Sequence, residues 1–158
     1  MGDRVGEGVA YGNLGNAYLI LRKLEEGIES HNKGLSIAKT VDDRVGEVVA
    51  YGSLGNAYES LGKFQEAIEY HNKYLSIAIE VGDMAGEGMA YGNLGNVHGS
   101  LGKFREAIEY TNKHLSVATE VGDRSEKEWT MEISAMLITV TSQGMLPIQR
   151  KGFRYRED

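Results

Sequence analysis

The 158-residue chain contains no cysteine, a single proline and a single tryptophan. Without cysteine it can form neither a disulfide nor a thiolate metal site. It has no apolar run near the roughly 18 residues that a membrane-spanning helix requires. Its opening, MGDRVGEGV, lacks the apolar segment of a signal peptide. We therefore expect a soluble, cytoplasmic protein.

Positive charge is also scarce, because 17 basic residues face 23 acidic ones and give a formal net charge of −6. This balance disfavours a general electrostatic attraction to nucleic acid or to an anionic membrane. The hydrophobic fraction of 41% and the charged fraction of 25% are typical of a globular domain. A function must therefore come from a local surface, and we expect neither nucleic acid nor membrane as a partner.

One phrase recurs in the chain every 40 residues: AYGNLGNAY begins at position 10, AYGSLGNAY at 50 and AYGNLGNVH at 90. A period of this length indicates a solenoid, in which each unit buries its apolar face only by stacking on its neighbours. The predicted organisation is three repeats, at 2–41, 42–81 and 82–121.

Each repeat is predicted to form two helices. In the second copy the apolar residues fall on two stripes of helical spacing, separated by the phrase LGKF. Gly62 and its counterpart Gly102 can take the left-handed conformation that ends a helix. In the phrase EVGD, Asp83 and Asp123 can cap the helix that follows. The pattern predicts an all-α fold, an α-solenoid of stacked antiparallel helix pairs.

These phrases resemble the tetratricopeptide repeat. In that family the first helix carries an aromatic residue, then Leu-Gly, then another aromatic residue, and the second helix carries a small residue. The spacing here is 40 instead of the usual 34, and no proline closes the units. The longer period is similar to the repeats of the Pins/LGN group of G-protein-signalling modulators, which implies a setting in G-protein or polarity signalling. The matching residues are Tyr11, Leu14, Gly15 and Tyr18, Tyr51, Leu54, Gly55 and Tyr58, with Ala67 and Ala107 as the small residues.

The glycines at 15, 55 and 95 fall in the middle of predicted helices, where each costs up to about 1 kcal/mol relative to alanine. We expect that the missing side chain lets the partner helix approach closely. The alternative, a phosphate-binding loop, requires a preceding strand with a G-x-G-x-x-G frame or a following lysine, and the sequence has none of these.

The resemblance implies that the first helices line the concave side of a curved stack. Asparagines lie off the apolar stripe of these helices, and an amide can pair with both the N–H and the C=O of an extended peptide. Apolar residues one turn earlier would form a wall beside them. The alternative is that the amides bond between helices and hold the stack together. The candidate peptide-binding residues are Asn13, Asn16, Ser53, Asn56, Asn93, Asn96, Val9, Val49 and Met89, with Asn16, Asn56 and Asn96 central.

Catalytic and metal sites are not expected. His31 and His71 occupy equivalent positions in successive repeats, but the third repeat has Thr111 there, so packing or surface roles are favoured over metal binding. The serine that recurs in LSIA and LSVA has no paired base at a suggestive spacing. The sequence therefore predicts a protein that is not an enzyme, with no cofactor.

The repeat pattern is abandoned after position 121. Residues 122–141 predict a partial repeat whose helix caps the third unit, with Ser125 and Glu128 as a capping box. Residues 142–158 change to a basic composition, and we interpret them as a mobile tail.

The function predicted from these observations is a non-catalytic scaffold that binds an extended peptide segment of a partner protein in its concave groove. The alternative is a structural spacer, or a self-associating fragment of a longer repeat array that interacts through the ends of the solenoid.

Overall fold

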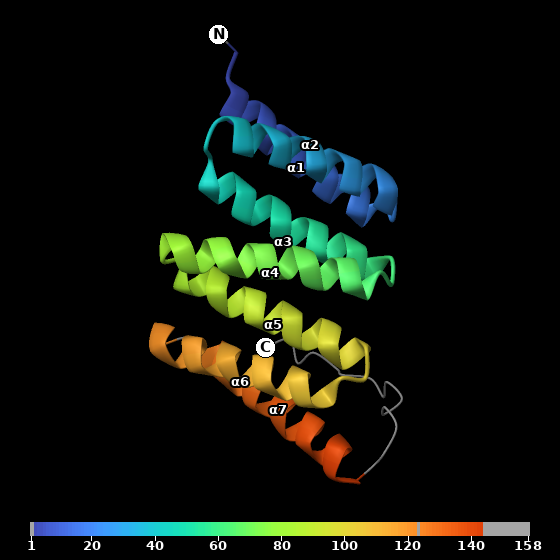
Figure 1. The fold of residues 1–158 in the computed structure, drawn as a ribbon, viewed down its shortest axis with the longest axis vertical. Helices are drawn as coiled ribbons and strands as arrows, with labels where there is room; N and C mark the ends of the chain where they lie inside the picture. Colours follow the sequence, from blue (N-terminus) through green and yellow to red (C-terminus); the bar gives the residue numbers. More distant parts are fainter. Residues whose placement is uncertain (1, 123, 144–158) are drawn as a thin grey trace, which may run out of the picture.

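The computed structural model describes residues 2–122 and 124–143, and the regular structure within them is entirely helical (Figure 1). The predicted tail therefore lies outside the described residues beyond position 143, as do the side chains of Ser125 and Glu128. The helices are α1 (Arg4–Ile20), α2 (Leu24–Thr40), α3 (Arg44–Ser60), α4 (Phe64–Val81), α5 (Met84–Ser100), α6 (Phe104–Val121) and α7 (Arg124–Gln143).

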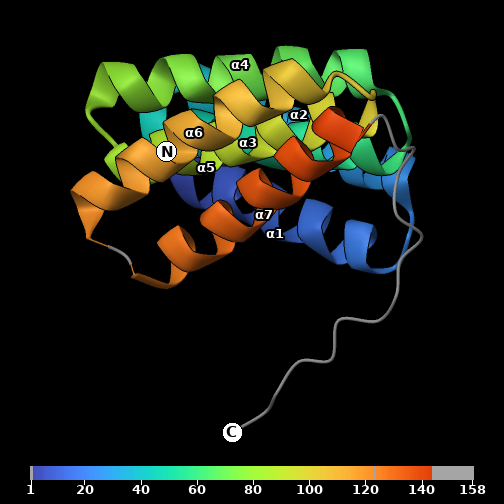
Figure 2. The same cartoon turned by 90° about the horizontal axis from the view of Figure 1, so that it is seen from below.

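Successive helices pack against each other along the whole chain, so that the fold is a stack of helix pairs. The odd-numbered helices also contact one another, α1 with α3 and α3 with α5. In the described part of the chain, α2, α4 and α6 make no such contacts among themselves. The stack is therefore tighter on the side of α1, α3 and α5, and we call the surface of these three helices the concave face. Figure 2 shows α4 and α6 on one side of the stack and α1 and α7 on the other. The predicted all-α solenoid is confirmed.

Aspartates cap first helices and left-handed residues follow the helix ends, as predicted for Asp83, Gly62 and Gly102, whereas the predicted cap Asp123 lies outside the described residues. The carboxylates of Asp43 and Asp83 each accept a hydrogen bond of 2.9 Å from the backbone N–H of the third residue onward. Arg22 and Asp42 take the left-handed conformation in the first repeat, with φ of 61° and 57°, where later copies use glycine. The left-handed glycines are Gly62, Gly82, Gly102 and Gly122.

The mid-helix glycines allow close packing within each helix pair. A Cβ atom built on Gly55 would lie 2.3 Å from the ring of His71, which is closer than real contacts allow. The same relation joins Gly15 to His31 at 2.7 Å, and Gly95 to the hydroxyl of Thr111 at 3.0 Å. The expected close approach of the partner helix is confirmed, and the side chain that uses the space is a buried histidine or threonine.

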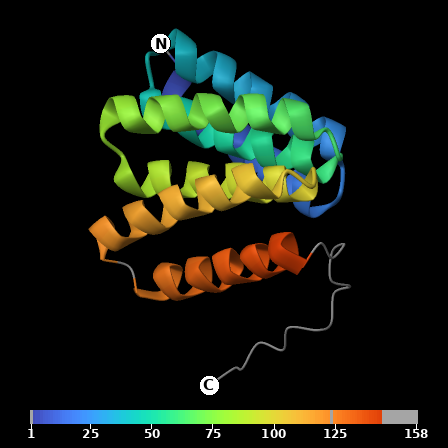
Figure 3. The ribbon, with the colours of Figure 1, turned by 60° about the horizontal axis from the view of Figure 1, so that its bottom comes forward.

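The core is best developed in the middle of the stack. Leu54 and Leu94 are completely buried, whereas the equivalent Leu14 is 44% exposed. At the other end, α7 packs against α6 and buries Thr130 (Figure 3). The last described helix, α7, extends to Gln143.

Two alanine substitutions test the role of the mid-helix glycines. Gly55→Ala introduces a methyl group into the space of the His71 ring, so overpacking of about 1–3 kcal/mol outweighs a propensity gain of about 1 kcal/mol. Gly12→Ala meets no atom within 4 Å and keeps only the gain. Urea denaturation followed by circular dichroism should show a lower free energy of unfolding for Gly55→Ala and a higher one for Gly12→Ala. Equal changes in both variants would contradict the packing role.

Candidate functional site

The polar candidates for peptide binding all lie on the concave face, two on each of α1, α3 and α5. The amides of Asn16, Asn56 and Asn96, which we call the amide ladder, are exposed to solvent. They occupy the same position on three successive odd-numbered helices, 40 residues apart. Of the other three, Asn13 is exposed, and Ser53 and Asn93 are half-buried.

Within residues 2–122 and 124–143, none of these six side chains makes a hydrogen bond to another side chain or to a neighbouring helix. The backbone oxygens of Asn56 and Asn96 accept bonds from the hydroxyls of Ser60 and Ser100, but their amide groups do not take part. The alternative that amides bond between helices to hold the stack is therefore not what the structure shows. Apolar contacts and close packing at the mid-helix glycines hold the stack together, and the amide groups are therefore available to a ligand.

Three apolar residues stand beside the ladder. Val9, Val49 and Met89, at three equivalent positions, are exposed by 56%, 55% and 51%. They lie one helical turn before Asn13, Ser53 and Asn93 on α1, α3 and α5. Amides and an apolar wall thus run side by side along the concave face.

The helices of this surface carry few basic residues of their own. The only lysine or arginine residues in α1, α3 and α5 are Arg4 and Arg44, each at the first position of its helix. Arg44 is engaged in ion pairs with Glu47 and Glu80. Lysines of the second helices lie over tyrosine rings of both layers, such as Lys33 at 5.8 Å from the ring centre of Tyr11 on α1. The concave face therefore has few free basic groups that could bind a carboxylate.

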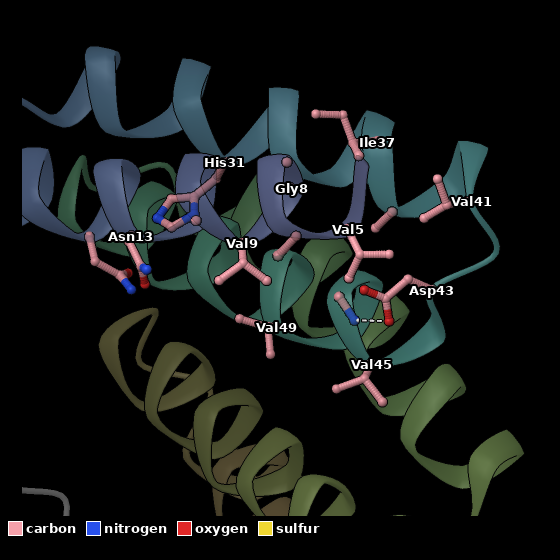
Figure 4. Close-up of a pocket in the computed structure, with 16 residues that line it drawn as sticks. Val5, Gly8, Val9, Asn13, His31, Ile37, Val41, Asp43, Val45 and Val49 are labelled. Carbon is pink, nitrogen blue, oxygen red and sulfur yellow. Dashed lines mark hydrogen bonds between the residues drawn. The ribbon is translucent and has the colours of Figure 1, made fainter. Parts of the chain in front are cut away.

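A cavity of about 240 Å³ opens between α1, α2 and α3 (Figure 4). Its lining includes the predicted residues Val9, Asn13, Asn16 and Val49, so the cavity is continuous with the concave face. Sequence reasoning did not identify this cavity. The signal was available in Gly34, which stands where the other repeats have larger side chains.

The histidines are packing residues, as predicted. His31 and His71 are 1% and 0% exposed and lie against the mid-helix glycines. Burial lowers the pKa of His31, and it lowers the pKa of His71 to about 4, so both rings are neutral at pH 7. His98 donates a hydrogen bond of 2.8 Å from Nδ1 to the carbonyl of Leu94 and lies 5.0 Å from the ring of Tyr110. Among the described residues, no group of three or more His, Asp or Glu side chains is arranged to hold a metal ion.

Two models of the tetratricopeptide repeat match the chain, over residues 7–80 and 90–119. Together with the stacked helix pairs, these matches show that the chain belongs to the tetratricopeptide-repeat proteins. Repeats of this family generally mediate protein–protein interaction. Comparison with curated protein sequences gives no match. In the part of the chain that the structure describes, no helix is long and apolar enough to cross a membrane.

Solved structures with this fold come from Arabidopsis, Bacillus subtilis and C. elegans, among others. The tetratricopeptide-repeat domain of Arabidopsis FLU is 24% identical, with a TM-score of 0.68, and the match covers 72% of this chain and 95% of that domain. Aspartyl phosphate phosphatase F from Bacillus subtilis is 17% identical with a TM-score of 0.83, covering 91% of this chain but only 38% of the phosphatase. The N-terminal domain of stress-induced protein-1 from C. elegans is 17% identical with a TM-score of 0.68, covering 84% of this chain and 98% of that domain. These similarities show the fold, and they do not show the resemblance to the Pins/LGN group.

The buried imidazole of His71 predicts a pH-dependent stability. Its pKa is about 4 in the folded chain and about 6.5 in the unfolded chain. Between pH 4 and pH 6.5, His71 is therefore protonated in the unfolded state but neutral in the folded state. The free energy of unfolding should therefore fall as the pH is lowered from 7 to 5, by up to about 1.4 kcal/mol per pH unit from this residue. His71→Thr copies the third repeat, where the Thr111 hydroxyl donates to the Ala107 carbonyl at 2.7 Å. Urea denaturation at pH 7 and pH 5 should show that this variant loses less free energy of unfolding than the parent chain. An equal loss in both would contradict the role of His71 in the pH dependence.

Proposed function

We propose that the protein is a non-catalytic interaction scaffold that holds an extended segment of a partner protein along its concave face. The observation that carries the proposal is the amide ladder, three exposed asparagines at equivalent positions whose side chains are not used by the fold. Each amide offers both a donor and an acceptor, and so can pair with the backbone of a peptide whatever its side chains are.

The length of the bound segment follows from the spacing of the helices. Packed helices lie roughly 8–10 Å apart, and an extended chain rises about 3.3 Å per residue. A peptide that crosses α1, α3 and α5 would therefore span about 6–12 residues. Because basic groups are scarce on the concave face, the ligand is an internal stretch with apolar side chains against Val9, Val49 and Met89, not a free C-terminus. A setting in G-protein or polarity signalling rests on the sequence resemblance alone.

The proposal is tested by binding of the purified chain to a displayed library of peptides of about 15 residues. The test variant carries Asn16→Ala, Asn56→Ala and Asn96→Ala. The matched control carries Asn32→Ala, Asn72→Ala and Asn112→Ala, which removes three exposed asparagines at equivalent positions of α2, α4 and α6.

The parent chain and the control should select the same peptides. The test variant should lose at least about tenfold in affinity, or about 1.4 kcal/mol, while its helical circular dichroism is unchanged. If the parent selects no peptide, or if both variants lose affinity equally, the concave face is not the binding surface.

A second candidate, part of a longer repeat array, is favoured by the exposed face of α1. In the second and third repeats, α3 and α5 pack against α2 and α4 of the preceding repeat, and Leu54 and Leu94 are fully buried. Leu14 has the same side chain at the equivalent position but is exposed. α2 packs against α3, and α4 packs against α5, but among the described residues no second helix of a preceding repeat packs against α1 in this way. The face of α1 is therefore suited to the second helix of a further repeat.

This candidate predicts that a copy of residues 42–81 placed before Gly2 stacks on α1. The thermal midpoint should then rise. In the extended protein, Leu14→Ala should cost about 2–5 kcal/mol, as it does for buried leucines, but much less in the original chain. An unchanged midpoint and equal costs in both chains would contradict an array.

Sedimentation velocity over a range of concentrations tests the other form of the proposal, in which copies of the chain associate through their ends. A monomer at all concentrations would contradict that form.

A further inference from the structure

The cavity between α1, α2 and α3 lies where the first repeat lacks a ring that the other repeats have. Position 34 is glycine, whereas the equivalent positions hold Tyr74 in the second repeat and His114 in the third. A Cβ atom on Gly52 would lie 3.4 Å from the Tyr74 ring, and one on Gly92 would lie 2.9 Å from the His114 ring. One on Gly12, the equivalent residue, meets no atom within 4 Å. Of the three equivalent glycines, Gly12 alone has open space above it, whereas a smaller cavity of about 100 Å³ lies at the equivalent place in the third repeat.

The walls of this space are mostly apolar, and it opens toward the concave face. Val9 of α1 and Val49 of α3 lie at its edge, and Ile37 of α2 lines its other side (Figure 4). Its volume of about 240 Å³ exceeds the roughly 150 Å³ of an apolar cavity that holds a benzene molecule. An aromatic side chain of a peptide on the concave face could therefore enter it.

One polar group on the α2 side of the cavity has no partner. His31 lines the cavity, is 1% exposed, and neither ring nitrogen makes a hydrogen bond to the protein. Burial lowers its pKa and keeps the ring neutral, with one nitrogen as donor and the other as acceptor. A buried polar group without a partner is unfavourable, so a ligand that pairs with it is favoured.

We propose that the cavity is a pocket for a tyrosine side chain of the bound partner, its ring over Gly12 and its hydroxyl paired with a ring nitrogen of His31. The inference rests on the proposed function and adds a specificity site to it. A tyrosine suits the pocket better than phenylalanine, which leaves His31 unpaired. Tyrosine also suits the pocket better than tryptophan. A phenol hydroxyl can both donate and accept a hydrogen bond, whereas the indole N–H of tryptophan can only donate one.

The pocket is tested without a peptide by titrating p-cresol, the analogue of the tyrosine side chain, into the full 158-residue chain. Nuclear magnetic resonance follows the methyl signals of Val9 and Val49. Saturable shifts are expected with a Kd of roughly 1 mM, as suits a ligand of eight non-hydrogen atoms. Toluene, which lacks the hydroxyl, should bind at least about fivefold more weakly.

Two pairs of variants identify the site. Gly12→Leu places its side chain in the open space over α1 and should weaken p-cresol binding by at least about tenfold, whereas Gly12→Ala adds one methyl group and should change it little. His31→Phe keeps a ring but removes the nitrogens, so it should abolish the preference for p-cresol over toluene. His71→Phe makes the same change in the second repeat, where Tyr74 occupies the equivalent space, and should leave the preference intact.

Absence of saturable p-cresol binding, or binding that Gly12→Leu does not weaken, overturns the pocket. If the peptide library still yields binders in that case, the proposed function stands and only the pocket is wrong. Conversely, p-cresol binding by a chain that selects no peptide would contradict the proposed function and the assignment to a partner's tyrosine. Peptides selected by the parent chain should contain tyrosine, and a tyrosine-to-phenylalanine change in them should weaken binding to the parent but not to His31→Phe.

Discussion

The structure depends on the close contact of paired helices at one glycine in each repeat. Gly15, Gly55 and Gly95 leave room for His31, His71 and Thr111, so a buried side chain of the second helix lies directly on the backbone of the first. Glycine in a helix is unfavourable by up to about 1 kcal/mol, and the fold offsets this cost by packing. Because the stack is held in this way and by apolar contacts, the asparagines next to these glycines are not needed between helices and remain free on the concave face.

The same arrangement explains why the repeats are similar in structure but not equal in surface. A single position on the second helix, occupied by glycine, tyrosine and histidine in turn, decides how much of the space over the first helix is filled. In the third repeat a smaller cavity of about 100 Å³ remains between α5 and α6, beside Gly88 and Met89. Variation within a fixed period thus produces differences in shape along the concave face, while the amide ladder stays constant. A regular backbone contact and an irregular set of pockets together would give a scaffold both affinity and selectivity.

Much of the fold could be predicted from the sequence, because the determinants are local and repeat three times. The period of 40, the aspartate caps and the glycine stops at Gly62 and Gly102 correctly placed the helices, and the mid-helix glycines correctly indicated close packing. Less of the candidate site than of the fold could be predicted. The amides of Asn16, Asn56 and Asn96 recur with the period of 40, and their place on the concave side was inferred from the family resemblance. The cavity followed from neither, since it lies between helices of two repeats, beside the missing side chain of Gly34. The exposure of Leu14 also escaped prediction, because its sequence context is nearly identical to that of the buried Leu54.

Contact between the amide ladder and the backbone of a bound peptide can be observed at the asparagines themselves. In the 15N-labelled chain, the chemical shifts of the asparagine side-chain amide groups are followed as a selected peptide is added. The amide signals of Asn16, Asn56 and Asn96 should shift and saturate together, while those of Asn32, Asn72 and Asn112 on the opposite layer should not move. Shifts confined to the second set, or a peptide that saturates the chain without moving the ladder signals, would contradict this contact.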